Sequence, residues 1–197
     1  MRVPRRAAAL TQAVGTVLLG RSLNAEPGSK RFYGATYATA ATWTAGGVLS
    51  RPPGGPQWTG RGAGEGIAVG TAAFGVFYGC AHVARRIPLL RRALTSAFRH
   101  VHVGRTSWVA TTTIVNGVAE EIYFRGALQD LVGAKKGTAL YVAAVAGSRN
   151  PALVLAAVIM GSALAWQRDR SGGLLAPTLA HVTWSVLMLR FVAPLFK

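Results

Sequence analysis

The sequence predicts an all-α fold, namely a polytopic bundle of transmembrane helices. Hydrophobic residues make up 51% of the 197-residue chain and charged residues only 14%, whereas soluble domains carry about 25% charged residues. Mean hydropathy is +0.32, and charge-free stretches recur along the chain. Because only helices and closed barrels satisfy their backbone hydrogen bonds in lipid, we interpret these stretches as membrane helices.

We expect about six spans. Crossing a bilayer takes roughly 20 mostly apolar residues, with a range of ~17–25, and four charge-free stretches of 18 or 19 residues meet that length: 32–50, 66–84, 150–167 and 172–189. Two shorter stretches, 106–119 and 137–148, can span only if the flanking Glu120, Glu121 and Arg149 are buried inside the bundle.

The remaining segments are basic or rich in proline and glycine. Residues 1–31 predict a basic N-terminal helix that is interfacial or partly inserted. Residues 50–66 contain too much proline and glycine for regular structure and predict a loop. Residues 85–105 alternate arginine with apolar side chains, which favours an amphipathic helix lying in the membrane interface. The chain thus divides into this N-terminal helix, accessory spans with the amphipathic helix (32–105), and a core that carries the polar site (106–197).

The net charge of +16 indicates contact with anionic lipid headgroups and not with nucleic acid. The 22 lysines and arginines lie mostly between and beside the apolar stretches, as in juxtamembrane loops. The composition, rich in alanine, arginine and glycine, is typical of GC-rich bacterial genomes, so we expect an integral protein of the bacterial plasma membrane. The single cysteine, Cys80, excludes an intrachain disulfide and a thiolate metal cluster.

Two Gly-x-x-x-Gly spacings occur in the second long stretch, at 66–70 and 75–79. Such spacings let helices approach closely. They predict either packing against another helix of this chain or contact with a second copy in a homodimer.

Two adjacent carboxylates and an arginine interrupt the apolar pattern at Glu120, Glu121 and Arg125. On a helix Glu121 and Arg125 share a face, and charged residues at membrane depth generally face the bundle interior and mark function. Arg125 can neutralise one carboxylate, which leaves the other available as a general base toward water. A purely structural ion pair between two helices is the alternative.

A second polar pair lies in the last stretch, where His181 and Ser185 also share a helical face. Pro177, four residues before His181, predicts a kink just ahead of the histidine. If the two helices meet, a histidine and a hydroxyl face a carboxylate, which together form a hydrolytic constellation of base, water and oxyanion donors.

These two motifs resemble those of a known family. The stretch EEIYFRG, from Glu120, is similar to the Glu-Glu-x-x-x-Arg signature of the CPBP family of CAAX-protease and bacteriocin-processing intramembrane endopeptidases. The stretch SGGLLAPTLAHVTWS, which contains His181, resembles that family's closing motif. The resemblance implies a helix bundle around an intramembrane site in which Glu120 activates water. It also implies that Glu121 and Arg125 support the site and that His181 helps to bind the oxyanion.

The sequence departs from the family at two places. Ser185 stands where the family has asparagine, and the middle motif Phe-x-x-x-His is absent, because no histidine occurs between Arg125 and His181. Either Arg149 or Asn150 supplies the missing polar group, or catalysis is impaired.

Two functions are consistent with these residues. The first is an intramembrane glutamate endopeptidase that cleaves a membrane-associated or lipidated peptide, with no metal or other cofactor. The second is a catalytically inactive membrane scaffold or accessory subunit, in which the charged cluster is structural and a membrane protein is the partner. We expect Glu120, Glu121, Arg125, His181 and Ser185 to form the site in the first case.

Overall fold

The protein is built from helices throughout its described part. The computed structural model describes residues 2–51, 58, 62–103 and 106–197, and within these ranges there is no strand. The all-α prediction is therefore confirmed. The helices, in chain order, are α1 (Arg2–Leu23), α2 (Lys30–Ser50), α3 (Ala63–Ala84), α4 (Pro88–Phe98), α5 (Thr106–Glu120), η1 (Glu121–Leu128), α6 (Gln129–Val132), α7 (Ala134–Ala146), α8 (Pro151–Ser171), α9 (Leu175–Leu187), η2 (Met188–Val192) and η3 (Ala193–Phe196).

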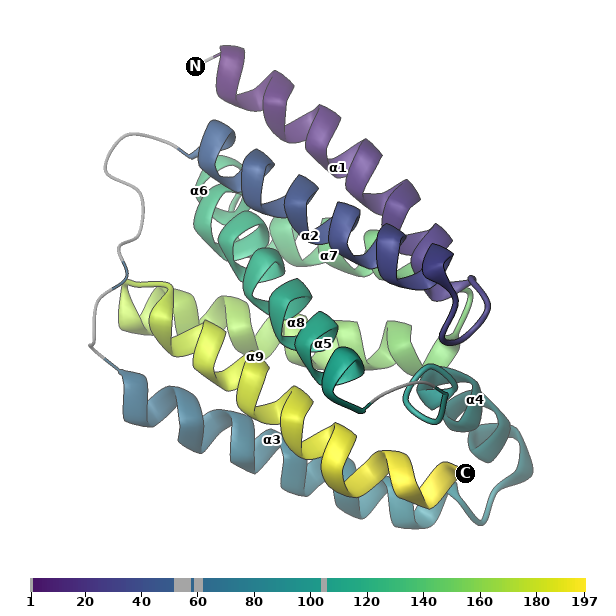
Figure 1. Ribbon diagram of the computed structural model, residues 1–197. Helices are drawn as coiled ribbons and strands as arrows, with labels where there is room; N and C mark the ends of the chain where they lie inside the picture. The colour runs from purple at the N-terminus through teal and green to yellow at the C-terminus, as the bar shows by residue number, and fades with distance from the viewer. Residues whose placement is uncertain (1, 52–57, 59–61, 104–105) are drawn as a thin grey trace.

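The helices form a bundle in which two pairs, one antiparallel (α1 and α2) and one parallel (α3 and α9), flank a central helix (Figure 1). α1 packs along α2 at one side, and α3 packs along α9 at the other, while α5 crosses between the two pairs and contacts both α2 and α9 (Figure 1). α7 and α8 pack against each other, and α8 also contacts α9. The polar residues of α5 and α9 therefore meet in the middle of the bundle.

Three helices are long and apolar enough to cross a membrane: Ala63–Ala84, Pro151–Ser171 and Leu175–Phe196, the last running from α9 through η3. They coincide with the stretches predicted at 66–84, 150–167 and 172–189. The stretches predicted at 32–50 and 106–119 are also helical, and 137–148 is helical as far as Ala146. Whether 32–50 and 106–119 cross the bilayer, and hence the count of spans, stays a prediction. The stretch 137–148 does not meet its condition, because Arg149 is exposed.

The central helix changes its winding at the charged motif. After α5 the chain continues without a break through η1, which is a π-helix, into α6. The wider winding is visible in the hydrogen bond from the Gln129 N–H to the Phe124 carbonyl, five residues earlier. π-Helical turns are uncommon and often lie at functional sites. Here the segment from Tyr123 to Leu128 is entirely buried.

Side chains lock this segment to its neighbours. The Tyr123 hydroxyl donates to the Ala8 carbonyl of α1 at 2.7 Å, and its ring stacks on the fully buried Trp43 of α2. On the opposite side, Gln129 donates to Asp169 of α8 at 2.7 Å. The π-helix is thus fixed between the α1–α2 pair and α8.

Glycines allow α3 and α9 to approach closely. A Cβ atom at Gly66 or Gly70 would collide with backbone carbonyl oxygens of α9, those of Ala176 and Ala180. Packing within the chain is therefore confirmed for the first glycine spacing. A Cβ at Gly75 or Gly79 would meet nothing within 4 Å, and the homodimer stays a prediction.

Three expectations need correction. Pro177 causes no kink, because α9 begins at Leu175 and the first four N–H groups of a helix lack intrahelical partners in any case. Arg149 is exposed, because α7 ends at Ala146 and the arginine lies in the following turn. Within the segment predicted as amphipathic, 85–105, the helix covers only Pro88–Phe98.

In the predicted loop 50–66, residues 52–57 and 59–61 lie outside the described residues.

Candidate functional site

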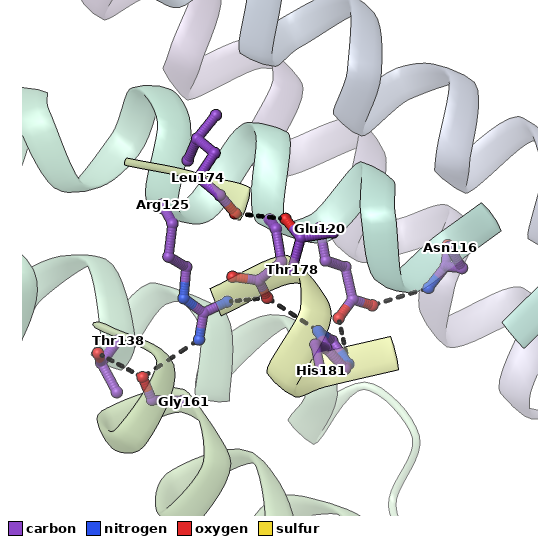
Figure 2. A network of polar contacts seen from close by, with 9 residues as sticks. Asn116, Glu120, Arg125, Thr138, Gly161, Leu174, Thr178 and His181 are labelled. Carbon is purple, nitrogen blue, oxygen red and sulfur yellow. Dashed lines mark hydrogen bonds and ion pairs between the residues drawn. The ribbon is translucent and has the colours of Figure 1, made fainter. Parts of the chain in front are cut away.

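The structure brings the two predicted motifs together in the bundle interior. Glu120, the last residue of α5, and Glu121, the first of η1, lie next to His181 of α9. Figure 2 shows Arg125 and Glu120 on one side of this cluster and His181 on the other. Residues 60 positions apart in the sequence therefore form one polar site, as the shared helical faces predicted.

Glu121 is the centre of a buried ionic network. Its side chain is 0% exposed, and its Oε1 atom accepts from Arg125 Nη1 at 3.1 Å and from His181 Nδ1 at 2.8 Å. Arg125 Nη2 donates to the Gly161 carbonyl of α8 at 3.1 Å, and the guanidinium lies 4.8 Å over the ring of Tyr141 on α7. The network of Glu121, Arg125 and His181 therefore connects η1, α7, α8 and α9, and the carboxylate at its centre is closed off from solvent.

Glu120 has a different environment. Its Oε1 atom accepts from Asn116 Nδ2 at 2.7 Å, one helical turn earlier. Its Oε2 atom lies 4.0 Å from His181 Nε2, which is too far for a hydrogen bond. A separation of this size is one that a single water molecule can bridge.

A cavity of about 230 Å³ adjoins Glu120. Its polar lining includes Asn116, Glu120, Tyr141, His181 and Ser185, and most of the remaining wall is apolar, with Leu19, Leu23, Phe32, Val145, Leu153, Met160 and Trp184. Neither Glu121 nor Arg125 lines this cavity. Of the two adjacent carboxylates, Glu120 is thus the one that can reach a molecule inside it.

Charge balance in the cluster depends on His181. A buried charge is costly unless it is paired, and two carboxylates with one guanidinium leave a net negative charge. An imidazolium at His181 brings the sum of the four groups to zero. In that state Nδ1 donates to Glu121 and Nε2 presents a second N–H toward Glu120 and the cavity.

Neither candidate for the missing middle motif reaches the site. The exposed Arg149 lies in the turn between α7 and α8. The Asn150 side chain caps α8 by accepting from the N–H groups of Ala152 and Leu153, and it donates to the Ala93 carbonyl at 2.8 Å. Both residues line a separate pocket, so the proposal that one of them replaces the histidine is wrong.

Two residues of the site were missed by sequence reasoning. Asn116 stands four positions before Glu120, a spacing that places both on one helical face, and this signal was present in the sequence. Tyr141 carried no such signal, because it lies on α7 and reaches the site only through the packing of α7 against η1. Among the residues that the structure describes, no group of three or more His, Cys, Asp or Glu side chains is arranged to hold a metal ion.

Comparison with known proteins supports the resemblance over the C-terminal half. Residues 102–187 match the family model described as type II CAAX prenyl endopeptidase Rce1-like. No curated protein matches, and no solved structure matches. The matched segment includes every predicted site residue, and the resemblance to the CPBP family is confirmed there. Together with the three apolar helices, this similarity indicates an integral membrane protein.

Proposed function

Because residues 102–187 match the type II CAAX prenyl endopeptidase Rce1-like family, we propose that the protein is an intramembrane endopeptidase in which Glu120 activates water. One observation carries this proposal. The Glu120 carboxylate lines a cavity, and its Oε2 atom lies 4.0 Å from His181 Nε2. A water molecule held between these atoms has a base on one side and a hydrogen-bond donor on the other.

The proposed reaction proceeds through a tetrahedral intermediate. Glu120 removes a proton from the water as its oxygen attacks the peptide carbonyl carbon. The carbonyl oxygen becomes an oxyanion, which accepts a hydrogen bond from the Nε2–H of an imidazolium at His181. The C–N bond then breaks, and the proton held by Glu120 passes to the leaving amine.

The other site residues act by holding these two groups in place. Glu121 fixes the His181 ring through Nδ1, and Arg125 neutralises Glu121. The Ser185 hydroxyl also lines the cavity and is a second, shorter donor toward the oxyanion. No step requires a metal, since the atom Nδ1 is already engaged by Glu121 and the adjacent guanidinium disfavours a cation.

The apolar wall of the cavity favours a substrate with apolar side chains or a lipid group next to the scissile bond. We therefore propose that the substrate is a membrane-associated peptide that carries such groups. We also propose that the protein lies in the bacterial plasma membrane. Anionic lipid headgroups are the proposed contacts of the exposed arginines.

A catalytically inactive scaffold is the second candidate. It is favoured by the sequence, which has no histidine between Arg125 and His181. It is also favoured by the positions of Arg149 and Asn150, which line another pocket. In this case the Glu121–Arg125–His181 network serves only to tie η1, α8 and α9 together, with another membrane protein as partner.

The test is a peptide-cleavage assay with the full chain in lipid nanodiscs. Glu120→Gln keeps the shape of the side chain and its acceptor for Asn116 but removes the base, so cleavage should disappear while the thermal unfolding temperature is retained. Glu65→Gln is the matched control, because Glu65 pairs with Arg170 on the surface of the bundle. Cleavage by both variants at the wild-type rate would refute the glutamate mechanism. No cleavage of a membrane-tethered peptide library, with Glu120→Gln functional in cells, would establish the scaffold.

A further inference from the structure

A second pocket, of about 160 Å³, lies beside the candidate active site and differs from it in character. It is formed where α1 ends, where α4 ends and where the turn joins α7 to α8. Its polar lining consists of Asn24, Ser96, Arg99, His100, Ser148, Arg149 and Asn150, and it includes no aspartate or glutamate. Two guanidinium groups without a carboxylate among them give the pocket a positive charge.

Arg99 is held in a fixed position. Its Nη2 atom donates to the carbonyls of Leu23 at 2.6 Å and Ala25 at 3.2 Å, at the C-terminus of α1. Its Nε atom donates to His100 Nε2 at 3.3 Å. Because the guanidinium is already ordered, a ligand that binds to it does not have to immobilise a free side chain.

His100 leaves one buried ring nitrogen without a partner. The side chain is 7% exposed, and its ring stacks on Phe32 of α2 with centroids 4.1 Å apart. Nε2 lies 3.3 Å from both Arg99 Nε and the Leu23 carbonyl oxygen. In a neutral ring it accepts from Arg99 when the hydrogen is on Nδ1, and it donates to Leu23 when the hydrogen is on Nε2. Nδ1 has no hydrogen-bond partner, although buried polar groups are nearly always paired. The pocket that His100 lines thus has an unpaired polar atom, which is a donor in the tautomer whose Nε2 accepts from Arg99.

Arg149 reaches the same pocket from a strained backbone position. Its φ angle is 58°, and within the described residues it is the one non-glycine residue with positive φ. Such a conformation is costly for a residue with a side chain and recurs at ligand sites. A glycine would suit this turn better, so the strain is consistent with a role for the guanidinium.

We propose that this pocket binds the phosphate group of an anionic phospholipid. The Arg149 guanidinium can form paired hydrogen bonds with phosphate oxygens, and Arg99 retains the two hydrogens on Nη1, since Nη2 and Nε are already engaged. His100 Nδ1 adds a donor in the tautomer whose Nε2 accepts from Arg99. A lipid is favoured over a soluble phosphate by the helix α4, which contributes Ser96 and Ala97. This helix exposes arginines and leucines together, as in Leu89, Leu90, Arg91 and Arg92, which is typical of helices that lie in the headgroup region.

The bound lipid would also lie against the wall of the active-site cavity. Leu23 and Leu153 line both pockets, so one layer of side chains separates the phosphate from the cavity. The binding itself does not depend on the proposed hydrolysis, and the two can fail independently.

The test measures lipid retention by the full chain with native mass spectrometry. The protein is released from micelles that contain phosphatidylcholine and increasing amounts of phosphatidylglycerol. Wild type should retain one phosphatidylglycerol. Arg149→Gln should raise the lipid concentration for half occupancy by about tenfold or more, the usual effect of losing a charge-assisted hydrogen bond. Arg91→Gln is the control, because it removes the same charge from an exposed site on α4 outside the pocket, and it should change half occupancy less than about twofold.

A second variant tests the histidine. His100→Phe keeps the aromatic stack on Phe32 but removes Nδ1, and it should weaken retention without loss of the folded protein, which is checked by the unfolding temperature. Equal effects of Arg149→Gln and Arg91→Gln would show that lipid is held by diffuse charge and would overturn the proposal. Displacement of phosphatidylglycerol by millimolar inorganic phosphate would overturn the lipid assignment in favour of a soluble phosphate.

Discussion

The Nδ1 atom of His181 lies 2.8 Å from Oε1 of Glu121, so the closing motif is bonded to the second glutamate of the pair and not to the first. The same oxygen accepts from Arg125 at 3.1 Å. As a result the opposite ring nitrogen, Nε2, is directed toward Glu120. The paired carboxylates therefore have separate tasks, since one fixes the histidine and the other lines the cavity.

This division predicts strong coupling between Glu121 and Arg125. Glu121→Gln or Arg125→Met alone leaves a buried charge without its partner, which should lower the free energy of unfolding by ~3–5 kcal/mol. The double variant should lose less than the sum of the two, because it removes both charges. Thermal unfolding in detergent measures all three. Additive losses would show that the pair does not interact in the folded protein.

Ser185→Ala serves as the comparison for that experiment. It removes one hydroxyl and should cost only ~1 kcal/mol. Equal destabilisation by Arg125→Ala and Ser185→Ala would contradict the burial of Arg125.

His181→Ala should lower turnover by ~10²–10³, the usual cost of losing one oxyanion donor. Ser185→Asn should raise turnover above wild type, because the longer side chain carries an amide donor farther into the cavity. Both effects are expected on kcat, measured with a tethered peptide in nanodiscs. A Ser185→Asn enzyme slower than Ser185→Ala would show that the cavity has no room for the amide.

Asn116 should act as a positioning residue for Glu120. Its amide donates to Glu120 Oε1 at 2.7 Å, which leaves Oε2 directed toward His181. Asn116→Ala should therefore reduce kcat with little change in KM, while Asn116→Gln restores part of the activity. Ser162→Ala removes an exposed hydroxyl of α8 outside both pockets and is the control. A change confined to KM would instead assign Asn116 to substrate binding.

His100 should titrate below its ordinary pKa. Burial, together with the adjacent Arg99, lowers the pKa of His100 from 6.5, although its hydrogen bond to the Leu23 carbonyl acts in the opposite direction. The charged groups that face it are Arg99 after α4 and Arg149 in the α7–α8 turn. NMR of the imidazole carbons measures this pKa directly. A value above 6.5 in neutral lipid would contradict the buried, cationic surroundings.

The sign of the stability effect follows from that shift. Between the lowered pKa of the folded state and 6.5, the unfolded chain binds more protons than the folded protein. The stabilising contribution of His100 to the free energy of unfolding is therefore fully present above pH 6.5 and is lost as the pH falls below that value. His100→Phe should remove this part of the pH dependence, which urea titrations at several pH values can measure.

Much of the fold could be predicted because apolar, charge-free stretches and helical spacing are local features. They located α3, α8 and α9, and they placed Glu121 beside Arg125 and His181 beside Ser185. The π-helix, the exposure of Arg149 and the contribution of Tyr141 could not be predicted in this way. Each depends on packing between distant segments, or on a turn whose geometry overrides the residue types within it. Pro177 shows the same limit, since its effect depended on where the helix begins.

The π-helix at Glu121–Leu128 also affects how this chain can tolerate changes of length. A π-turn contains one residue more than an α-turn, so loss of a single residue between Arg125 and Leu128 can be absorbed if the segment rewinds as an ordinary α-helix. The residues that follow, Gln129 included, then keep the faces that they present now. An added residue has no such compensation, because each residue of an α-helix rotates the chain by about 100°, and Gln129 would lose Asp169. We expect insertions in this segment to be harder to tolerate than single deletions.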